Sequence, residues 1–234
     1  MEIIQLDLKF NYNDMEMVIH PSVIKDEKEI ILVDCGYPNM LPILEKELEN
    51  KGVSPESVTK VLITHHDDDH MGALYEFKKK YPGIKVLASD IEKDYISGKK
   101  KSLRLIQAEE MLNHLPEEEK DFGLAFIENL KKIKHVPVDI AVKDGDHFEW
   151  AGGCKILSTP GHTPGHISIY NEKLDTVITG DAAVVENEKL SVANPQFALN
   201  LTDATKSLEK LVNLNARNYF CYHGGTYINE KQKE

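Results

Sequence analysis

Short apolar runs alternate along the chain with charged or turn-forming segments, a pattern typical of a mixed α/β protein. Near the N-terminus the pattern predicts three strands, at residues 3–10, 16–20 and 29–33. Leucines and isoleucines at helical spacing then predict a helix from about residue 39 to residue 51. The compact apolar run at residues 58–63 predicts a buried strand. Ligands of layered α/β proteins gather beyond the carboxyl ends of strands, so the residues after this run are candidates for a site.

The middle of the chain is predicted to be mainly helical. A helix at residues 72–80 and a strand at 84–88 precede a further helix that begins at Ser89. Residues from about 97 to 135 are helical in pattern and strongly charged, and two interpretations stay open for them. They form either an insertion that covers a substrate site as a lid or an outer pair of helices without a role in substrate selection. The second half predicts strands at 139–142, 155–157, 166–170, 176–178 and 218–222, with a helix at 203–214.

The charge of the chain narrows the class of partner. Its 39 acidic and 28 basic residues give a formal net charge of −11. Binding to nucleic acid needs a surplus of Lys and Arg that neutralises phosphates, and an anionic membrane surface needs the same surplus. We therefore expect a small-molecule substrate, no nucleic acid and no membrane partner. A homodimer is compatible with this composition.

The cysteines and the N-terminal residues indicate the compartment. Cys35, Cys154 and Cys221 show no CxxC spacing, which predicts reduced thiols. The first residues lack a basic segment followed by an apolar run, and no stretch approaches the ~18 apolar residues that span a bilayer. A cytoplasmic location is expected.

A cluster of imidazoles and carboxylates directly follows the apolar run at residues 58–63. It reads His65-His66-Asp67-Asp68-Asp69-His70. Buried at the end of a strand, these groups are costly unless something pairs with them, and a divalent cation does so with this ligand set. His65, Asp67 and Asp69 alternate in an extended chain, whereas His70 breaks the alternation. The loop must therefore turn and can serve two neighbouring ions.

Three later polar residues also follow strand candidates. His162 lies in a loop of Pro and Gly residues, which fix and re-aim the backbone. Asp181 follows Gly180, and His223 precedes two glycines. Each alone is more often a structural group than a ligand, but with the cluster they form one constellation.

In this order, the four elements resemble the metallo-β-lactamase-fold hydrolases over nearly the whole chain. The family pattern is Thr-His-x-His-x-Asp-His, then Pro-Gly-His-Thr-Pro-Gly-His, a Gly-Asp and a late His-Gly. Here the first element begins at Thr64, and Asp67 stands at its second histidine, giving an HxDxDH variant of HxHxDH. The resemblance implies an α/β fold, a four-layer αββα sandwich of two mixed β-sheets flanked by helices. It further implies one domain of residues 1–234 with a helical insertion at about 97–135.

Carried over by position, the resemblance implies two divalent metal ions per chain. The first would be held by His65, Asp67 and His162, the second by Asp69, His70 and His223, and Asp181 would bridge them. Zinc is the first expectation, with iron or manganese as alternatives that the carboxylate of Asp67 favours. A second interpretation is that Asp67 leaves the first site weak and the enzyme works with one ion.

Neighbouring polar residues are expected to support the ligands. Asp34 matches an aspartate of the family and is expected to orient a ligand histidine. His66 and Asp68 occupy variable positions of the pattern and are expected to point away or to hydrogen-bond outside the ligand set. His166 is expected to be a supporting or packing residue.

The resemblance implies a hydrolase in which a metal-bridged hydroxide attacks a small ester, thioester or lactone. Asp69 would be catalytic, orienting the nucleophile or shuttling its proton. The alternative is a mononuclear iron oxygenase or a metal-binding sensor on the same fold. Three differences from known subfamilies argue against a glyoxalase II and a class B1 or B2 β-lactamase and weaken the lactonase interpretation. A glyoxalase II continues well beyond the last metal histidine, lactonases carry a tyrosine where Val184 stands, and class B1 and B2 β-lactamases carry a cysteine where Asp181 stands.

Overall fold

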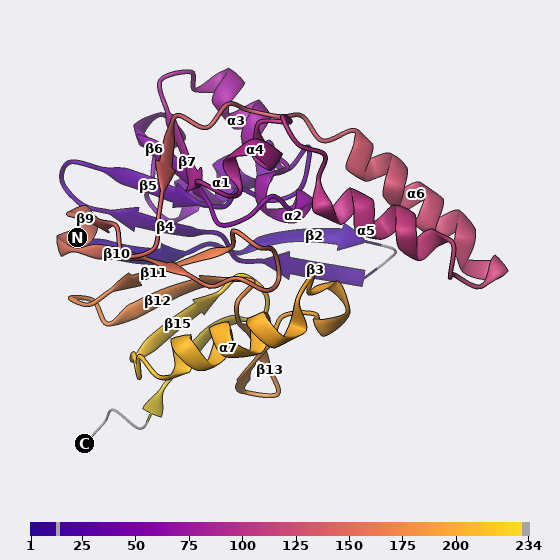
Figure 1. The fold of residues 1–234 in the computed structure, drawn as a ribbon. Helices are drawn as coiled ribbons and strands as arrows, with labels where there is room; N and C mark the ends of the chain where they lie inside the picture. The colour runs from indigo at the N-terminus through magenta and orange to yellow at the C-terminus, as the bar shows by residue number, and fades with distance from the viewer. Residues whose placement is uncertain (13–14, 231–234) are drawn as a thin grey trace.

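Two six-stranded sheets pack against each other in the computed structural model, which describes residues 1–12 and 15–230 (Figure 1). The first sheet has the order β1-β4-β5-β6-β7-β8. Its strands are β1 Glu2–Gln5, β4 Ser22–Lys25, β5 Ile30–Val33, β6 Lys60–Ile63, β7 Lys85–Ser89 and β8 Ile140–Val142. The strands from β5 to β8 run parallel, whereas β4 is antiparallel to β1 and β5, so the sheet is mixed.

The second sheet has the order β16-β15-β12-β11-β10-β9. Its strands are β9 His147–Phe148, β10 Cys154–Ser158, β11 Ile167–Asn171, β12 Thr176–Gly180, β15 Asn218–Cys221 and β16 Gly225–Ile228. Only the β12–β15 pair is parallel among the paired strands of this described sheet. Two hairpins complete the strands: β2 Leu8–Tyr12 with β3 Met15–Ile19, and β13 Val184–Glu186 with β14 Lys189–Ser191.

Helices cover the outer faces of both sheets (Figure 1). On the first sheet lie α1 Leu41–Asn50, α2 Asp68–Met71, α3 Leu74–Lys80 and α4 Lys93–Ile96, and on the second lies α7 Leu201–Val212. The helices α5 Leu103–Leu112 and α6 Lys120–Lys131 project from one end as an antiparallel pair. Four short 3₁₀ turns are η1 Pro55–Ser57, η2 Glu117–Glu119, η3 Trp150–Gly152 and η4 Pro195–Phe197.

Apolar side chains form three main layers between these elements. The central layer joins strands of both sheets, and includes Ile31, Leu62 and Ile169. The outer layers join the first sheet to α1 and α3 and the second sheet to α7. This is the expected four-layer αββα sandwich of two mixed sheets. In the part of the chain that the structure describes, no helix is both long enough and apolar enough to cross a membrane.

Several element boundaries differ from the predictions. Residues 3–10 fall in two strands, because Leu6 and Asp7 interrupt the run; β1 before them pairs with β4, whereas β2 after them pairs with β3. The short strand β4 was not predicted, since four residues give too little alternation to recognise. The helix expected to begin at Ser89 begins at Lys93, because Ser89 ends β7 and its hydroxyl donates to the carbonyl of Gly165.

Candidate metal centre

The loop after β6 carries the imidazoles and carboxylates predicted from the sequence. His65 lies in a bend directly after the strand, Asp67 has extended backbone angles, and α2 then begins at Asp68. The carbonyl of Asp67 accepts a hydrogen bond from the N–H of His70, which starts the helical turn. This turn brings Asp69 and His70 back toward the end of the strand, as the break in alternation predicted.

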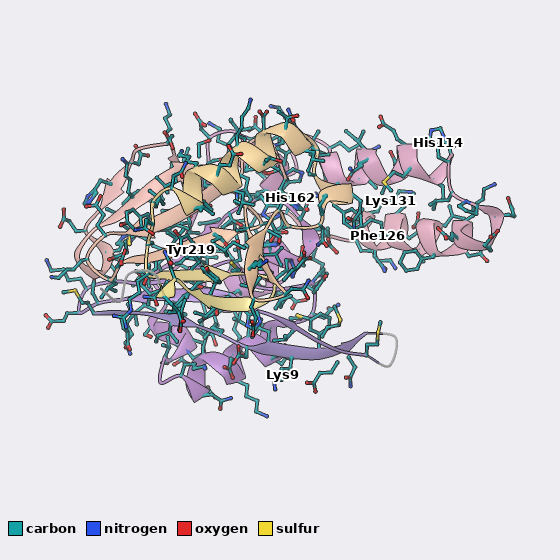
Figure 2. The ribbon with its side chains drawn as sticks, turned by 90° about the horizontal axis from the view of Figure 1, so that it is seen from below. Lys9, His114, Phe126, Lys131, His162 and Tyr219 are labelled. Atoms are coloured by element: carbon teal, nitrogen blue, oxygen red, sulfur yellow. The ribbon has the colours of Figure 1, made fainter. Side chains whose placement is uncertain are left out.

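The second sheet supplies the other three side chains from the ends of its strands. His162 lies in the loop between β10 and β11, Asp181 follows β12, and His223 follows β15. Figure 2 shows His162 near the place where the pair of helices α5 and α6 joins the body of the protein. The structure thus brings together all seven residues that were predicted as ligands, at one end of the two sheets.

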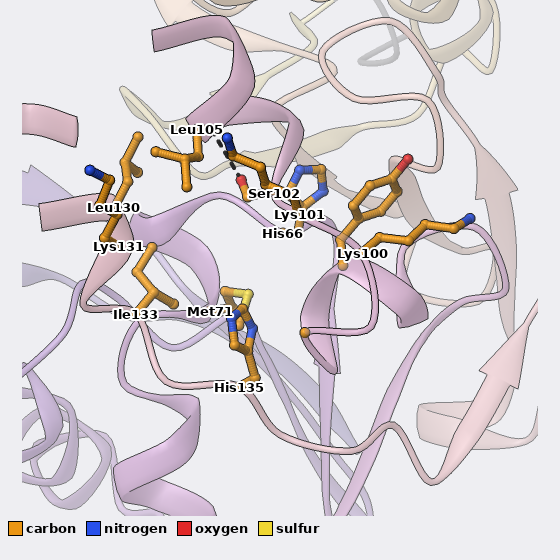
Figure 3. Close-up of a pocket in the computed structure, with 12 residues that line it drawn as sticks. His66, Met71, Lys100, Lys101, Ser102, Leu105, Leu130, Lys131, Ile133 and His135 are labelled. Carbon is orange, nitrogen blue, oxygen red and sulfur yellow. Dashed lines mark hydrogen bonds between the residues drawn. The ribbon is translucent and has the colours of Figure 1, made fainter. Parts of the chain in front are cut away.

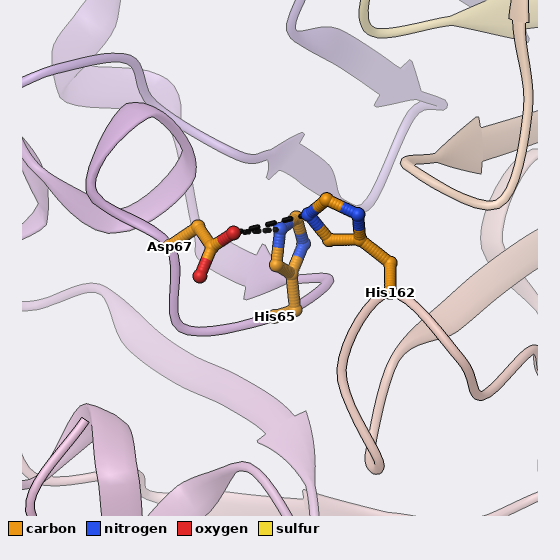
Figure 4. A group of neighbouring side chains, drawn as sticks. All are labelled: His65, Asp67 and His162. Atoms are coloured by element: carbon orange, nitrogen blue, oxygen red, sulfur yellow. Dashed lines mark hydrogen bonds and ion pairs between the residues drawn. The ribbon is translucent and has the colours of Figure 1, made fainter. Parts of the chain in front are cut away.

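His65, Asp67 and His162 form the first group, which we call site one (Figure 4). One oxygen of Asp67, Oδ2, faces both imidazoles. It lies 3.5 Å from Nε2 of His65 and 3.0 Å from Nε2 of His162. Ligand atoms around a tetrahedral zinc ion are separated by about 3.3 Å when the metal–ligand bonds are about 2.0–2.1 Å. The spacing of site one therefore fits a metal ion.

Asp69, His70 and His223 form the second group, site two. Oδ2 of Asp69 lies 3.1 Å from Nε2 of His223 and 3.6 Å from Nε2 of His70. Asp181 faces both sites with different oxygens. Its Oδ1 lies 3.2 Å from Nε2 of His70, and its Oδ2 lies 3.4 Å from Nε2 of His162. A carboxylate in this position can join two metal positions.

The buried atoms of the centre have unmet bonding capacity that a cation would meet. Among the residues that the structure describes, Nε2 of His65, Nε2 of His70 and Oδ1 of Asp181 are buried without a hydrogen-bond partner. Buried polar atoms are nearly always paired, so three of them aimed at one volume indicate a ligand. Imidazole nitrogens and carboxylate oxygens are the donors that zinc, iron and manganese accept.

The charges of the centre favour a bound cation. Burial lowers the pKa of His65 well below its usual value, so this imidazole stays neutral and keeps a lone pair. Burial acts the same way on His70, but the carboxylates of Asp69, Asp181 and Asp34 outweigh it and raise the pKa of His70 well above its usual value. The carboxylates that would hold a proton on His70 would equally attract a metal ion in its place.

Asp34 supports the ligand histidines, as the sequence predicted. Its Oδ2 lies 2.8 Å from Nδ1 of His70 and accepts a hydrogen bond from the hydroxyl of Thr64 at 2.8 Å. The same hydroxyl lies 3.1 Å from Nδ1 of His65. Asp34 and Thr64 therefore fix the orientation of two imidazole rings.

His66 joins the metal loop to the neighbouring helices. Its side chain is buried, forms a short contact through Nδ1 with the carboxylate of Glu92, and stacks on Tyr95. Nε2 of His66 accepts a hydrogen bond from the N–H of Leu103 at the start of α5. His66 therefore points away from the ligand set, in agreement with the prediction from its variable position.

Glu92 also holds the second metal loop. Its Oε1 accepts hydrogen bonds from the hydroxyl of Thr163 at 2.8 Å and from the N–H of Gly165 at 2.9 Å. These two residues flank the end of the His162 loop, so Glu92 links both loops through one buried carboxylate. Nothing in the sequence around Glu92 marks this role.

His166 holds the position of Asp181. Its Nε2 accepts a hydrogen bond from the N–H of Asp181 at 2.8 Å, so Nδ1 carries the proton and faces Thr159 at 2.8 Å. Burial lowers the pKa of His166 to about 3, which keeps the ring neutral and in this tautomer. His166 is thus the supporting residue that was predicted.

Arg104 also belongs to the centre, although no motif in the sequence predicts it. It lies on α5 within the segment 97–135, and its guanidinium donates to Oδ2 of Asp67 from Nη2 at 2.6 Å and from Nε at 3.0 Å. Burial raises the pKa of Asp67, but the charge of Arg104 and the hydrogen bonds of His162 and His65 together outweigh this effect and hold that pKa well below its usual value. The departure from the family pattern at Asp67 was the available signal that an unusual partner stands beside it.

A cavity of about 200 Å³ lies behind the metal loop (Figure 3). His66 and Met71 line it from the loop, and Ser102 and Leu105 line it from the beginning of α5. The ring nitrogens of His66 are already bonded to Glu92 and to the backbone of α5. The segment 97–135 therefore lines this cavity together with the metal loop, and it also contacts the loop through Leu103 and Arg104.

The two sites differ in their exposure to solvent. The side chains of Asp69 and His223 are 13% and 24% exposed, whereas those of His65 and His162 are 0% and 4% exposed. A small molecule from solution would therefore meet site two before site one.

Comparisons with known proteins agree with this geometry. The family model described as the metallo-beta-lactamase superfamily matches residues 17–223. The probable metallo-hydrolase YflN of Bacillus subtilis is 24% identical over 205 residues, which cover 83% of this chain and 75% of that protein. The hydroxyacylglutathione hydrolase GloC of Haemophilus influenzae is 28% identical over 158 residues, covering 67% of this chain and 62% of that protein. The crystal structure of a metallo-beta-lactamase family protein from Thermus thermophilus superposes with a TM-score of 0.73 at 25% identity, covering 99% of this chain and 76% of that one.

Proposed function

The chain belongs to the metallo-β-lactamase superfamily, and from this premise we propose that it is a dinuclear metallo-hydrolase that cleaves a small ester, thioester or lactone. The observation that carries the proposal is the position of Asp181, whose two oxygens face the histidines of different sites. Two divalent ions are the cofactors we propose, zinc first and iron or manganese as alternatives.

The distances between the candidate ligand atoms assign three residues to each proposed ion. His65, Asp67 and His162 would hold one ion, and Asp69, His70 and His223 the other. Bound ions would supply hydroxide at neutral pH and would stabilise negative charge on the carbonyl oxygen of the substrate. The protein contributes rigid ligands, because Asp34, Glu92 and His166 fix the loops on which they lie.

Asp69 is the residue that we propose for proton transfer. It is the most exposed carboxylate of the centre's ligands, and its Oδ2 faces His223 at the solvent side. Its backbone carbonyl accepts a hydrogen bond from the hydroxyl of Tyr222 at 2.5 Å, which fixes the start of α2. Asp69 can therefore orient an attacking water molecule and pass its proton outward to the leaving group.

The substrate class is supported by the relatives and by the charge of the chain. A hydroxyacylglutathione, the compound named for GloC, is a thioester, and such substrates are small. The net charge of −11 disfavours a polyanionic partner. We therefore propose a thioester or a related acyl compound in the cytoplasm, with no nucleic-acid or membrane partner.

The test is a panel of ester, thioester, lactone, β-lactam and phosphodiester substrates, assayed with protein loaded separately with zinc, manganese or iron. We expect hydrolysis of at least one acyl substrate, and a loss of at least about 1,000-fold in kcat/KM in Asp181→Ala, because both ions lose a ligand. Asp203→Ala, at a partly exposed position in the first turn of α7, is the matched control and should keep full activity.

Two results would contradict the proposal. One is the absence of hydrolysis across the panel with every metal. The other is consumption of oxygen by protein that carries a single iron, which would instead support the mononuclear oxygenase. Full hydrolytic activity in Asp181→Ala would show that Asp181 is not a ligand that the reaction needs.

A further inference from the structure

Arg104 is one of two arginines in the chain and lies in the interior of the metal centre. Its side chain is 5% exposed. Besides its two hydrogen bonds to Oδ2 of Asp67, it places Nη2 3.2 Å from Nε2 of His162. The guanidinium therefore contacts two of the three residues of site one. The atoms it contacts, Oδ2 of Asp67 and Nε2 of His162, are the ones that would bind a metal ion there.

The position of this guanidinium is fixed on its other edge. Nη1 donates to the carbonyl of Phe197 at 2.6 Å and makes a short hydrogen bond to Oε1 of Gln107. The guanidinium also lies over the ring of Phe197, with Cζ 5.4 Å from the ring centroid. Every nitrogen of the guanidinium therefore has a hydrogen-bond partner. These contacts fix the side chain of Arg104 between site one and the turn η4.

A metal ion at site one would share its ligand atoms with this positive charge. Zinc bonds to nitrogen and oxygen are about 2.0–2.2 Å long, so an ion bound to Oδ2 of Asp67 and Nε2 of His162 would lie within about 4 Å of Nη2 of Arg104. Two cations at that distance repel each other strongly in a buried site. Arg104 also uses electron pairs of Asp67 and His162 that the metal ion would need.

Site two has different neighbours. The carboxylates that face site two belong to Asp69 and Asp181. Each forms ion pairs with His70 and His223, the two histidines of site two. Oδ1 of Asp181 and Nε2 of His70 have no hydrogen-bond partner in the part of the chain that the structure describes. Among the described residues, the contacts given for these site-two atoms are thus with one another, whereas Arg104 also contacts Oδ2 of Asp67 and Nε2 of His162 in site one.

We propose that Arg104 makes the two metal positions unequal, so that site two holds its ion tightly and site one binds a second ion far more weakly. Arg104 supplies part of the positive charge that a metal ion supplies at site one. Asp67 is the matching change, because a carboxylate at this position neutralises the guanidinium, whereas an imidazole would leave its charge uncompensated. This inference rests on the metal binding assumed in the proposed function, but not on hydrolysis.

The experiment measures metal binding and needs no substrate. Protein freed of metal is titrated with Zn²⁺ against a chromophoric chelator, and metal content is measured by elemental analysis after gel filtration. We expect the wild type to retain one zinc per chain and to bind the second at least about 100-fold more weakly. A parallel titration with Co²⁺, followed by its visible absorption, should show two separate phases.

Arg104→Met tests the role of the charge, since methionine keeps much of the side-chain length and lacks the guanidinium. We expect affinity at site one to rise at least about 10-fold and affinity at site two to change less than about threefold, because site two lies beyond the contacts of Arg104. Arg104→Lys, which keeps a positive charge, should remain close to the wild type. The control is Arg217→Met, which removes the other, exposed arginine and should change neither affinity.

A second variant distinguishes a change in metal affinity from a loss of folding. Asp67→His combined with Arg104→Met restores the imidazole of the family pattern and leaves no unpaired buried charge, and it should bind two zinc ions of similar affinity. Two ions of similar affinity in the wild type would overturn the inference, as would equal binding by wild type and Arg104→Met. Either result leaves the proposed hydrolase standing. A wild type that binds neither zinc nor manganese nor iron would overturn both.

Discussion

The carboxylate of Asp34 holds His70 from behind, with its Oδ2 2.8 Å from Nδ1 of the imidazole. Both side chains are buried, and Asp34 accepts two further hydrogen bonds from the backbone N–H and the hydroxyl of Thr64. With Nδ1 donating to the carboxylate, loss of the other ring proton of His70 leaves the lone pair on Nε2, which faces Asp181. The contact therefore selects the tautomer that can bind a metal ion at site two.

Asp34→Asn should weaken metal binding at site two by about 10- to 100-fold. The asparagine amide has one acceptor oxygen where three donors meet, so an N–H group must face either His70 or Thr64. The measurement is competition with a chelator. The control is Asp7→Asn, which removes a similar contact to Nδ1 of His20 at 2.9 Å outside the centre. Unchanged affinity in Asp34→Asn would show that the tautomer of His70 does not depend on Asp34.

Glu92→Gln should destabilise the fold by about 3 kcal/mol, because the buried carboxylate accepts hydrogen bonds from both metal loops. Its partners are His66, Thr163 and Gly165, and a glutamine amide would present a donor to some of these donors. The measurement is urea denaturation at pH 7. Glu118→Gln, an exposed change in η2, should stay within about 0.5 kcal/mol of the wild type. A Glu92→Gln variant as stable as this control would contradict the role given to Glu92.

The candidate ligands could be predicted from the sequence because they lie in segments that follow the ends of strands. The apolar runs that became β6, β12 and β15 are visible without a structure, and their ends meet at one edge of the sandwich. The resemblance then placed Asp181 between the two groups, and the distances agree with that position.

The residues that hold the metal loops or contact the candidate ligands could not be predicted in the same way. Arg104 lies on α5, 37 residues along the chain from its partner Asp67, and Glu92 lies directly before α4, 26 residues from its partner His66. Their roles depend on how α4 and α5 pack beside the metal loop, and neither the helical pattern nor the composition contains that information. The helical pattern of residues 97–135 is compatible with both a lid and an outer helical pair, and it does not indicate a side chain that reaches into the centre.

Gly161→Ala should separate the His162 loop from α7. Gly161 has φ of +133°, and a Cβ there would lie 2.0 Å from the backbone N of Ala204. Because that atom belongs to helix backbone, either the loop or α7 must move, and we expect a loss of about 3 kcal/mol in stability together with weaker metal binding at site one. Gly83→Ala is the control, since a Cβ at Gly83 meets no described atom within 4 Å. Equal stability of the two variants by urea denaturation would exclude this close approach.

Asp26→Asn should reduce stability by about 1–2 kcal/mol at pH 7 and by progressively less in acid. Burial raises the pKa of Asp26, but hydrogen bonds from backbone N–H groups outweigh it and lower that pKa; the donors are Lys28, Ala151 and Glu29. Because the folded pKa lies below the unfolded value of about 3.9, the contribution is complete above that pH and is lost as the pH falls through the folded pKa. Urea denaturation from pH 7 to pH 3 should therefore show a constant difference down to about pH 5 that shrinks below about pH 4. The exposed change Glu27→Gln should show no such difference, and a deficit in Asp26→Asn that persists or grows in acid would rule out this linkage.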